Sequence, residues 1–292
     1  MKPQTSHRKL FALAVTGLTI AGASSASAAT TAYRNLILGD NPIAYYELDE
    51  TTGTNAANSS SLGAAQDAGH NGTLNLGQAS AHTFLGTSYD FAGGYAVAAA
   101  IPNSLTEWTM EAWVKYSSDK TSDSHIVSND QGGWNDDVFF GINPEGGLLG
   151  AGAGTIGAGH QDNASSTRDY AGFAMSTDTW HHVAVTASNT SGLLSVYIDG
   201  SLVVSNTNAN STWTFNGADG FGTGAHFTLG AKRSSGGNVY DGLLDELAIY
   251  DSVLSESDLA ARANFDPNAI PEPSTTALLG LGGFALILRR RK

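Results

Sequence analysis

The sequence contains no cysteine among its 292 residues. This absence excludes disulfide bonds, thiolate zinc sites and a cysteine nucleophile. Charged residues are also scarce, at 14% of the chain, whereas glycine supplies 35 residues. A chain that is poor in charge and rich in glycine and small polar residues favours many short strands and turns over a helical fold.

Basic residues are especially rare in the central part of the chain. Residues 30–270 hold 7 Lys and Arg residues against 26 Asp and Glu residues, because the other basic residues lie at the two ends. Such an acidic surface repels nucleic acid, which is therefore excluded as a partner. The same surface suits divalent cations or basic partners, and it also suits a chain whose charge serves solubility alone.

Residues 1–28 have the pattern of a secretory signal peptide. A basic start is followed by an apolar run over residues 10–23, and Ala26, Ser27 and Ala28 supply the small residues of a cleavage site. A short buried helix is the alternative, but the basic flank, the length of the run and the cleavage site agree on export. In an oxidising compartment, a domain without cysteine depends on its core for stability, with or without help from a metal.

The C-terminus carries a second targeting pattern. Pro271, Glu272 and Pro273 precede an apolar stretch over residues 275–288 and a basic end, Arg-Arg-Arg-Lys. Fourteen residues are few for a bilayer core of about 30 Å, which needs about 20, and the basic cluster marks the cytoplasmic side. In composition and position the pattern resembles the PEP-CTERM sorting signal of Gram-negative bacteria.

This resemblance implies a series of processing steps. A hydrophobic helix and basic tail over residues 274–292 would associate transiently with the membrane. An exosortase-type protease would then cleave near Pro271, Glu272 and Pro273, and the protein would be delivered to the cell surface or to an extracellular matrix.

Residues 30–265 are predicted to form one all-β domain, joined to the sorting tail by a linker over residues 266–273. Alternation of apolar and polar residues over 108–116 predicts a half-buried strand. Asp199 and Gly200 stand between two β-branched segments and predict a tight hairpin turn. A glycine-rich patch over residues 146–159 is typical of a loop.

The remaining elements complete an antiparallel sandwich. One helix is expected over residues 255–262, with Ser255 as its cap and Asp258 three residues later. Many short strands without intervening helices predict two packed antiparallel sheets. Further strands are expected over residues 43–48, 88–91, 137–142, 180–186, 226–230 and 244–250.

Seven segments between residues 40 and 262 together resemble the successive signatures of laminin G-like, concanavalin A-like jelly rolls. The resemblance implies a jelly-roll sandwich of two curved antiparallel sheets. It also implies a module of a kind that is mostly non-catalytic, that binds glycans or proteins, often with calcium, and that is sometimes purely architectural. The segments are residues 42–54 (PIAYYELDETTGT), 69–73 (GHNGT), 89–94 (YDFAGG), 109–114 (TMEAWV), 180–185 (WHHVAV), 196–200 (VYIDG) and 241–255 (DGLLDELAIYDSVLS).

Calcium is the cofactor that the resemblance suggests. Asp90 and Asp245 lie in segments where related jelly rolls often have structural calcium ligands. A calcium ion takes six to eight oxygen ligands, and loop carbonyls and water can supply those that the carboxylates do not. The alternative is that Asp90 only caps a turn and that Glu246, beside Asp245, only faces solvent.

The sequence offers no catalytic grouping. Related laminarinases carry acids on one face of a strand, whereas Glu47, Asp49 and Glu50 lack that spacing, and a retaining pair needs carboxyl groups about 5–5.5 Å apart. His181 and His182 are adjacent in a strand and face opposite sides, so that one is expected in the sheet and one at the surface. No Ser-His-Asp grouping can be assigned from spacing.

Two aromatic residues are candidates for sugar binding, because aromatic rings stack on the apolar faces of pyranoses. Trp134 lies in a polar, loop-like segment, and Tyr240 is a second candidate. Trp108, Trp113 and Trp180 lie in strand patterns and are assigned to the core.

The sequence therefore predicts an exported, non-catalytic module that binds extracellular polysaccharide. The alternatives are a purely structural component of a matrix or biofilm, and a glycoside hydrolase.

Overall fold

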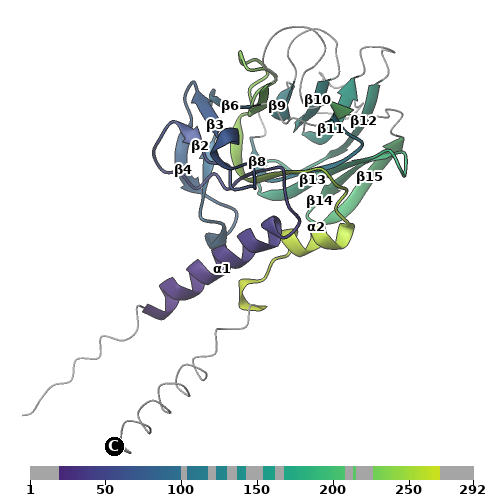
Figure 1. Ribbon diagram of the computed structural model, residues 1–292. Coiled ribbons are helices and arrows are strands. Elements are labelled where there is room, and N and C mark those ends of the chain that lie inside the picture. The colour runs from purple at the N-terminus through teal and green to yellow at the C-terminus, as the bar shows by residue number, and fades with distance from the viewer. Residues whose placement is uncertain are drawn as a thin grey trace, which may run out of the picture.

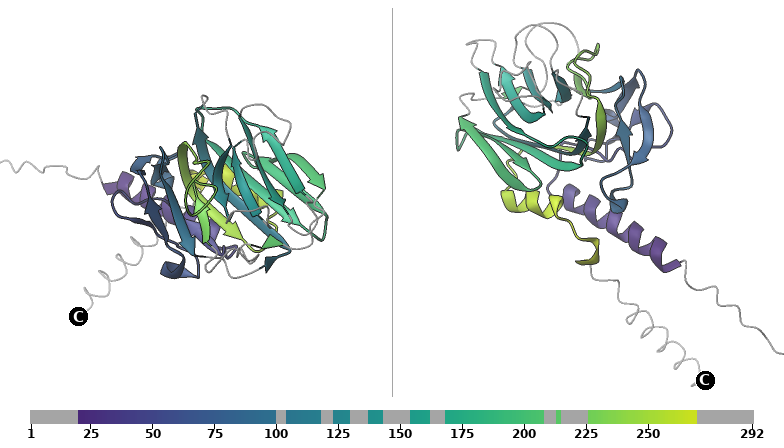
Figure 2. Two further views of the ribbon diagram at one scale, coloured as in Figure 1. Left: turned by 90° about the horizontal axis from the view of Figure 1, so that it is seen from above. Right: turned by 180° about the vertical axis from the view of Figure 1, so that it is seen from behind.

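The computed structural model describes residues 20–99, 104–117, 123–129, 137–142, 154–161, 168–207, 213–214 and 226–269. Within these residues, two antiparallel sheets of eight strands pack face to face, and two helices lie against one of them (Figures 1 and 2). This is the predicted all-β, concanavalin A-like jelly-roll sandwich.

The first sheet has the strand order β15-β14-β13-β8-β18-β5-β4, with β1 paired beside β18. Its strands are β1 (Ala44–Tyr46), β4 (Asn75–Ala79), β5 (Thr87–Asp90), β8 (Glu107–Tyr116), β13 (His181–Ser188), β14 (Leu193–Ile198), β15 (Ser201–Thr207) and β18 (Gly242–Tyr250).

The second sheet has the order β12-β11-β10-β9-β17-β6-β3-β2, and a separate pair joins β7 (Ser104–Leu105) to β16 (Trp213–Thr214). The strands of the second sheet are β2 (Asn55–Ala56), β3 (Ala68–Asn71), β6 (Tyr95–Ala99), β9 (Ser124–Ser128), β10 (Asp137–Ile142), β11 (Thr155–Gln161), β12 (Arg168–Ala174) and β17 (His226–Leu229).

The main core lies between the two sheets. It follows the two-residue period of the strands, since alternate residues of each strand point inward. On β8 these are Trp108, Met110, Ala112 and Val114, and all four are fully buried. The predicted core positions of Trp108 and Trp113 are confirmed, whereas Trp180 is half-buried and precedes β13.

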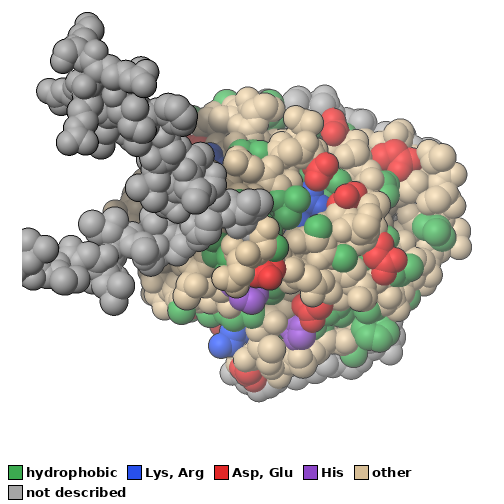
Figure 3. All heavy atoms as spheres, turned by 90° about the horizontal axis from the view of Figure 1, so that it is seen from below, with side chains coloured by type: hydrophobic (Ala, Val, Ile, Leu, Met, Phe, Trp, Pro, Cys, Tyr) green, Lys and Arg blue, Asp and Glu red, His purple; other side chains and the backbone are tan. Residues whose placement is uncertain are grey.

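The prediction that β8 is half-buried is wrong. The residues of its other face, Thr109, Glu111 and Trp113, are buried as well. The reason is a second apolar cluster on the outer face of the first sheet, in which helix α1 (Ile20–Leu38), helix α2 (Glu256–Ala263) and the 3-10 turn η2 (Thr83–Leu85) cover the strands. Figure 3 shows this face of the molecule, where acidic side chains are scattered among uncharged ones.

Helix α1 extends over residues 29–38, where the sequence predicted no helix, and the removal of residues 1–28 as a signal peptide stays a prediction. The helix runs through the predicted cleavage residues Ala26 and Ala28 and continues to Leu38. Ala29, Tyr33 and Ile37 are buried at a spacing of four residues, so that one helical stripe faces the sheet. In the described part of the chain, no helix is both long enough and apolar enough to span a membrane.

The local predictions based on turn and cap residues are confirmed. Asp199 (φ 51°) and Gly200 (φ 79°) form the turn between β14 and β15. A Cβ on Gly200 would lie 2.6 Å from the Cα of Ala260, so glycine also lets helix α2 approach closely. Ser255 and Asp258 form a reciprocal capping box at the start of α2.

The glycine-rich patch is only partly described. Residues 155–159 belong to strand β11 and not to a loop, and residues 146–153 lie outside the described residues. The other expected strands occur within a few residues of their predicted bounds. The 3-10 turns η1 (Gly63–Gln66) and η4 (Pro267–Ala269) complete the described elements.

Replacing Ile37 with alanine tests the docking of α1. Ile37 is fully buried, and removing a buried isoleucine side chain costs about 2–5 kcal/mol. We expect Ile37→Ala to lower the free energy of unfolding in urea by that amount. The exposed helix residue Asn35 is the control, and Asn35→Ala is expected to stay within about 0.5 kcal/mol of the unaltered protein. Equal stability of the two variants would contradict the docking.

Candidate functional site

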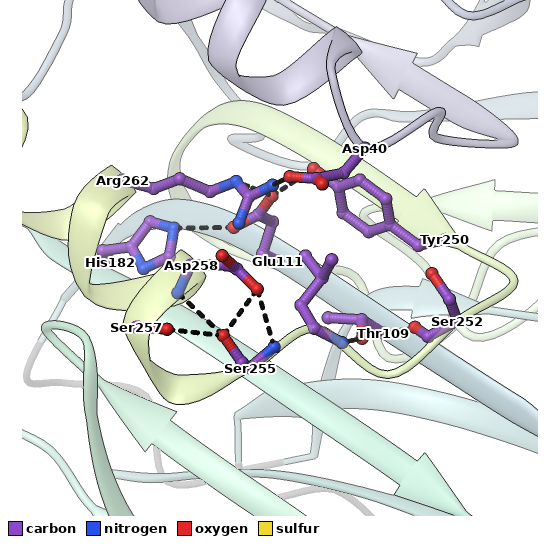
Figure 4. A network of polar contacts seen from close by, with 11 residues as sticks. Asp40, Thr109, Glu111, His182, Tyr250, Ser252, Ser255, Ser257, Asp258 and Arg262 are labelled. Atoms are coloured by element: carbon purple, nitrogen blue, oxygen red, sulfur yellow. Dashed lines mark hydrogen bonds and ion pairs between the residues drawn. The ribbon is translucent and has the colours of Figure 1, made fainter.

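A buried polar network joins the first sheet to its covering helices (Figure 4). Its centre is Glu111 on β8, which is 1% exposed. Oε2 of Glu111 lies 3.1 Å from Nε2 of His182, and Oε1 accepts a hydrogen bond from the Tyr250 hydroxyl. Both partners belong to neighbouring strands, so the sheet itself holds the carboxylate.

Helix α2 supplies the positive charge of this network. Nε of Arg262 lies 3.1 Å from Oε1 of Glu111, and its NH2 group donates to Asp40, just after α1. The Arg262 side chain is fully buried, and its guanidinium also lies over the ring of Tyr250, 5.5 Å from the centroid. One side chain therefore links α2 to the sheet and to the end of α1.

The charge of Glu111 is stabilised in this position. Burial raises the pKa of its carboxyl, but the charge of Arg262 and the hydrogen bonds from His182 and Tyr250 outweigh burial and leave the pKa below its usual value. Glu111, His182 and Arg262 are buried and both carboxylate oxygens of Glu111 have partners, so the network serves to fix the helices.

A second buried pair of acids lies on β18. The register of β18 against β8 shifts between Asp245 and Ala248, and Glu246 within this bulge has a φ of 52°. Asp245 accepts a hydrogen bond from the Ser80 hydroxyl, and Glu246 accepts one from the Tyr45 hydroxyl. The alternative that Glu246 only faces solvent is wrong, because it is 4% exposed.

These two acids differ from Glu111 in the direction in which their pKa values are shifted. Burial raises the pKa of both carboxyl groups well above the usual value, and nearby acids, Glu246 for Asp245 and Glu47 for Glu246, raise them further. Oδ1 of Asp245 is buried without a hydrogen-bond partner. The bulge thus holds acidic groups that no buried cation neutralises within the described residues.

The two predicted metal ligands, Asp90 and Asp245, form hydrogen bonds with different partners. Asp90 accepts a hydrogen bond of 2.9 Å from the side chain of Asn75, and Asp245 is bonded to Ser80. Across the described segments, no three His, Asp or Glu side chains are grouped so that they could hold a metal ion. Calcium binding by Asp90 and Asp245 stays a prediction.

The three acids considered for glycoside cleavage each form a hydrogen bond or ion pair with a different residue. Glu47 lies 3.1 Å from Nε of Arg34, Asp49 accepts a hydrogen bond of 2.6 Å from the amide of Thr87, and Glu50 accepts one of 2.6 Å from the Tyr89 hydroxyl. Their arrangement gives no support to a catalytic carboxylate pair.

Tyr240 lies in the core. Its side chain is fully buried, its ring packs on that of Phe91 at 6.2 Å, and its hydroxyl donates to the carbonyl of Leu243. The prediction that Tyr240 forms part of a sugar platform is therefore corrected, because the ring is closed to a ligand. Trp134 and the processing residues Pro271, Glu272 and Pro273 lie outside the described residues.

The two adjacent histidines follow the prediction. His182 is buried beside Glu111, whereas His181 lies nearer the surface, with its Nδ1 2.8 Å from Asp199. Nε2 of His181 lies 2.6 Å from the hydroxyl oxygen of Ser176. Sequence spacing missed this grouping of Ser176, His181 and Asp199, because it depends on the path of the loop between β12 and β13.

The outer face of the second sheet carries an aromatic row. Phe139 on β10, Gly159 on β11 and Tyr170 on β12 are neighbours in register. The Phe139 ring lies 5.7 Å from the ring of Tyr170 and 5.7 Å from that of His125. Phe139 and His125 are buried, whereas Tyr170 is half-buried.

A row of glycines runs beside these rings. Gly157 on β11 pairs with Gly141 on β10 and with Gly172 on β12. Gly141 lets β9 approach closely, since a Cβ there would lie 2.2 Å from the carbonyl oxygen of Ser124. Gly141 and Gly157 are buried, whereas Gly172 is half-buried. These strands lie on the side of the molecule opposite α1 and α2 (Figure 1).

Two packed antiparallel sheets with helices on one outer face define a lectin-like jelly roll. A model of the concanavalin A-like lectin/glucanases superfamily matches residues 90–260. The chain belongs to this superfamily. A model of the PEP-CTERM protein-sorting motif matches residues 269–292, as the sequence pattern predicts, and this motif indicates an exported protein that exosortase processes at the cell envelope.

Several solved structures share the fold. The binding domain of botulinum neurotoxin serotype D is 14% identical (TM-score 0.55), and the match covers 78% of this chain and 52% of that one. The ligand-binding domain of the same serotype in complex with N-acetylneuraminic acid is 15% identical (TM-score 0.52), covering 80% and 52% of the two chains. The chain thus spans about half the length of these toxin domains.

Another similar structure is a domain of comparable size. Domain 4 of AbnA, a GH43 extracellular arabinanase from Geobacillus stearothermophilus, in complex with arabinotriose, is 19% identical (TM-score 0.52). The match covers 77% of this chain and 98% of that one. No curated protein sequence matches the chain.

Replacing Arg262 with methionine tests the buried network. The change keeps most of the side-chain volume but leaves Glu111 without its cation, and breaking a buried ion pair in this way costs about 3–5 kcal/mol. We expect a loss of that size in urea unfolding. Arg34→Met is the matched control, because Arg34 is 45% exposed beside Glu47 and such a pair contributes at most about 1 kcal/mol.

A double variant separates charge from packing. If the buried charge of Glu111 causes the loss, Glu111→Gln added to Arg262→Met restores part of the stability. A loss of unfolding free energy in the double variant that equals the sum of the losses in the two single variants would contradict this explanation.

Proposed function

We propose that this exported domain binds extracellular carbohydrate at a site that carries out no catalysis. Of the four sheet faces, two form the core between the sheets, and the outer face of the first sheet is covered by α1, α2 and η2. No described helix covers the outer face of the second sheet, and Tyr170 and Gly172 at its β12 edge are only half-buried, so we place the ligand at this edge. This division of the faces is the observation that carries the proposal.

The chemistry of that face suits a sugar. Tyr170 on β12 offers a half-buried ring that packs beside the ring of Phe139, and the half-buried Gly172 leaves the same edge of the sheet without a bulky side chain. A sugar needs an aromatic surface for its C–H groups and polar edges for its hydroxyls. Trp134 falls in the segment that enters β10, and we propose it as a second aromatic contact.

The similar structures support the same class of function. The complexes with arabinotriose and with N-acetylneuraminic acid contain a saccharide on a related fold. Together with the sorting motif, they favour a polysaccharide outside the cell as the ligand and the surface or extracellular matrix of a Gram-negative bacterium as the location.

Substitution of Tyr170 tests this site. On a glycan array that includes arabino-oligosaccharides, sialylated glycans and β-glucans, we expect the protein to bind at least one glycan. Affinity for it is expected to fall about three- to tenfold in Tyr170→Ala, because aromatic contacts contribute about 0.5–1.5 kcal/mol. Phe173→Ala is the control, since Phe173 lies on the same strand, on its opposite face, and is 45% exposed.

Three outcomes distinguish the proposals. A selective loss in Tyr170→Ala supports carbohydrate binding by the second sheet. An equal loss of glycan affinity in Tyr170→Ala and Phe173→Ala would mean that the glycan binds elsewhere, and it would overturn this assignment. Binding to no glycan, with and without calcium, overturns carbohydrate binding and leaves a structural component of the matrix as the function.

We also propose one bound calcium ion, with Asp245 as a ligand. The buried, unpartnered Oδ1 of Asp245 fits a cation, whereas the bond between Asp90 and Asn75 would have to open. Calcium at 100 times its Kd is expected to raise the free energy of unfolding by about 2.7 kcal/mol. Asp245→Asn is expected to abolish this response. Magnesium is the control ion. The proposal would be contradicted if magnesium stabilised the protein as much as calcium does, or if calcium stabilised Asp245→Asn as much as the unaltered protein.

A further inference from the structure

Ser176, His181 and Asp199 form a continuous chain of hydrogen bonds at the surface of the domain. The hydroxyl oxygen of Ser176 lies 2.6 Å from Nε2 of His181, and Nδ1 of the same ring lies 2.8 Å from Oδ2 of Asp199. The three residues come from the loop after β12, from the start of β13 and from the turn between β14 and β15.

The acid of this group is held in place by the backbone. Oδ1 of Asp199 accepts a hydrogen bond of 3.0 Å from the amide of His182, which leaves Oδ2 for His181. The turn that carries Asp199 is fixed by Gly200, which lies against Ala260 of helix α2. An acid that is fixed in this way keeps the proton of His181 on Nδ1, so that Nε2 is free to accept the proton of Ser176.

The loop that carries Ser176 is also defined. Asp178 has a φ of 58°, and its amide donates a hydrogen bond of 2.8 Å to the carbonyl of Tyr116. Ser176 is exposed, and the amide of Thr177, directly after it, donates to no group in the described residues. In many serine hydrolases the amide after the nucleophile stabilises the oxyanion.

We propose that Ser176, His181 and Asp199 form an esterase site for small carboxylic esters. The Ser176 oxygen adds to the ester carbonyl carbon while its proton passes to Nε2 of His181. The tetrahedral intermediate then expels the alcohol, which takes that proton, and leaves an acylated Ser176. Water then attacks the acyl carbon and gives a proton to Nε2 of His181. The second tetrahedral intermediate collapses, His181 returns this proton to the Ser176 oxygen as the acyl–oxygen bond breaks, and the carboxylic acid is released.

The surroundings restrict the substrate and the rate. Small esters such as acetates are the expected substrates, because Ser176 is exposed and a longer acyl chain would bury little apolar surface there. The Asp199 side chain is 53% exposed and the His181 side chain 14%, so water weakens the electrostatic contribution. General-base assistance of this kind contributes about 10²–10⁴-fold.

This inference departs from the sequence prediction of a module without catalysis, and it is independent of carbohydrate binding by the second sheet. Ser176 and His181 are the catalytic residues, because their atoms exchange the proton with the substrate. Asp199 is a positioning residue, because it acts through His181.

Labelling with a fluorophosphonate probe, followed by mass spectrometry of the peptides, tests the nucleophile. We expect the full-length protein to be labelled at Ser176 and the label to fall at least tenfold in His181→Gln. Ser257 is the matched control, as an exposed serine that contacts another serine and no histidine. No label at Ser176, or equal labelling of Ser257, would overturn the proposal.

Hydrolysis of p-nitrophenyl acetate tests turnover. The rate is expected to fall at least tenfold in Ser176→Ala and to stay unchanged in Ser257→Ala. Asp199→Asn retains a residue that tolerates the turn conformation, so its melting temperature is expected to stay the same while the rate falls and its pH profile shifts. If Ser176→Ala hydrolyses p-nitrophenyl acetate as fast as the unaltered protein, the proposal is overturned. The three residues would then only stabilise the hairpin.

Discussion

The ion pair between Arg262 and Glu111 is the contact on which the covered face of the first sheet depends. Glu111 stands on the strand at the middle of that sheet, and without a cation its buried charge would have no compensation. Arg262 supplies this cation from α2 and also reaches Asp40 at the end of α1. A single buried side chain thus fixes two helices that are far apart in the sequence.

Closing this face decides where function can lie. With α1 and α2 in place, the rings of Tyr33, Trp113 and Tyr250 form a second core, and Trp113 donates a hydrogen bond of 3.0 Å to the hydroxyl of Tyr33. In a chain without cysteine, this second core takes the place that disulfides have in many exported domains.

The parts that the sequence predicted well are local. The Asp199-Gly200 turn and the Ser255-Asp258 cap depend on residues within a few positions, so their chemistry can be read directly. The burial of Glu111 could not be predicted, because alternation along β8 placed it on a solvent face and only Arg262, from a distant helix, changes that. Tyr240, a sequence candidate for sugar binding, is buried because its ring packs on Phe91, which is distant in sequence. The Ser176 grouping depends on a loop path and two turns, which spacing does not contain.

The central claim is that carbohydrate binds the outer face of the second sheet. Amide hydrogen exchange of the intact protein, with and without a glycan that it binds, tests this claim most directly. We expect slower exchange in β10, β11 and β12 when the glycan is present and no change in α1 or α2. Protection confined to α1 and α2, or an identical exchange pattern with and without the glycan, would contradict it.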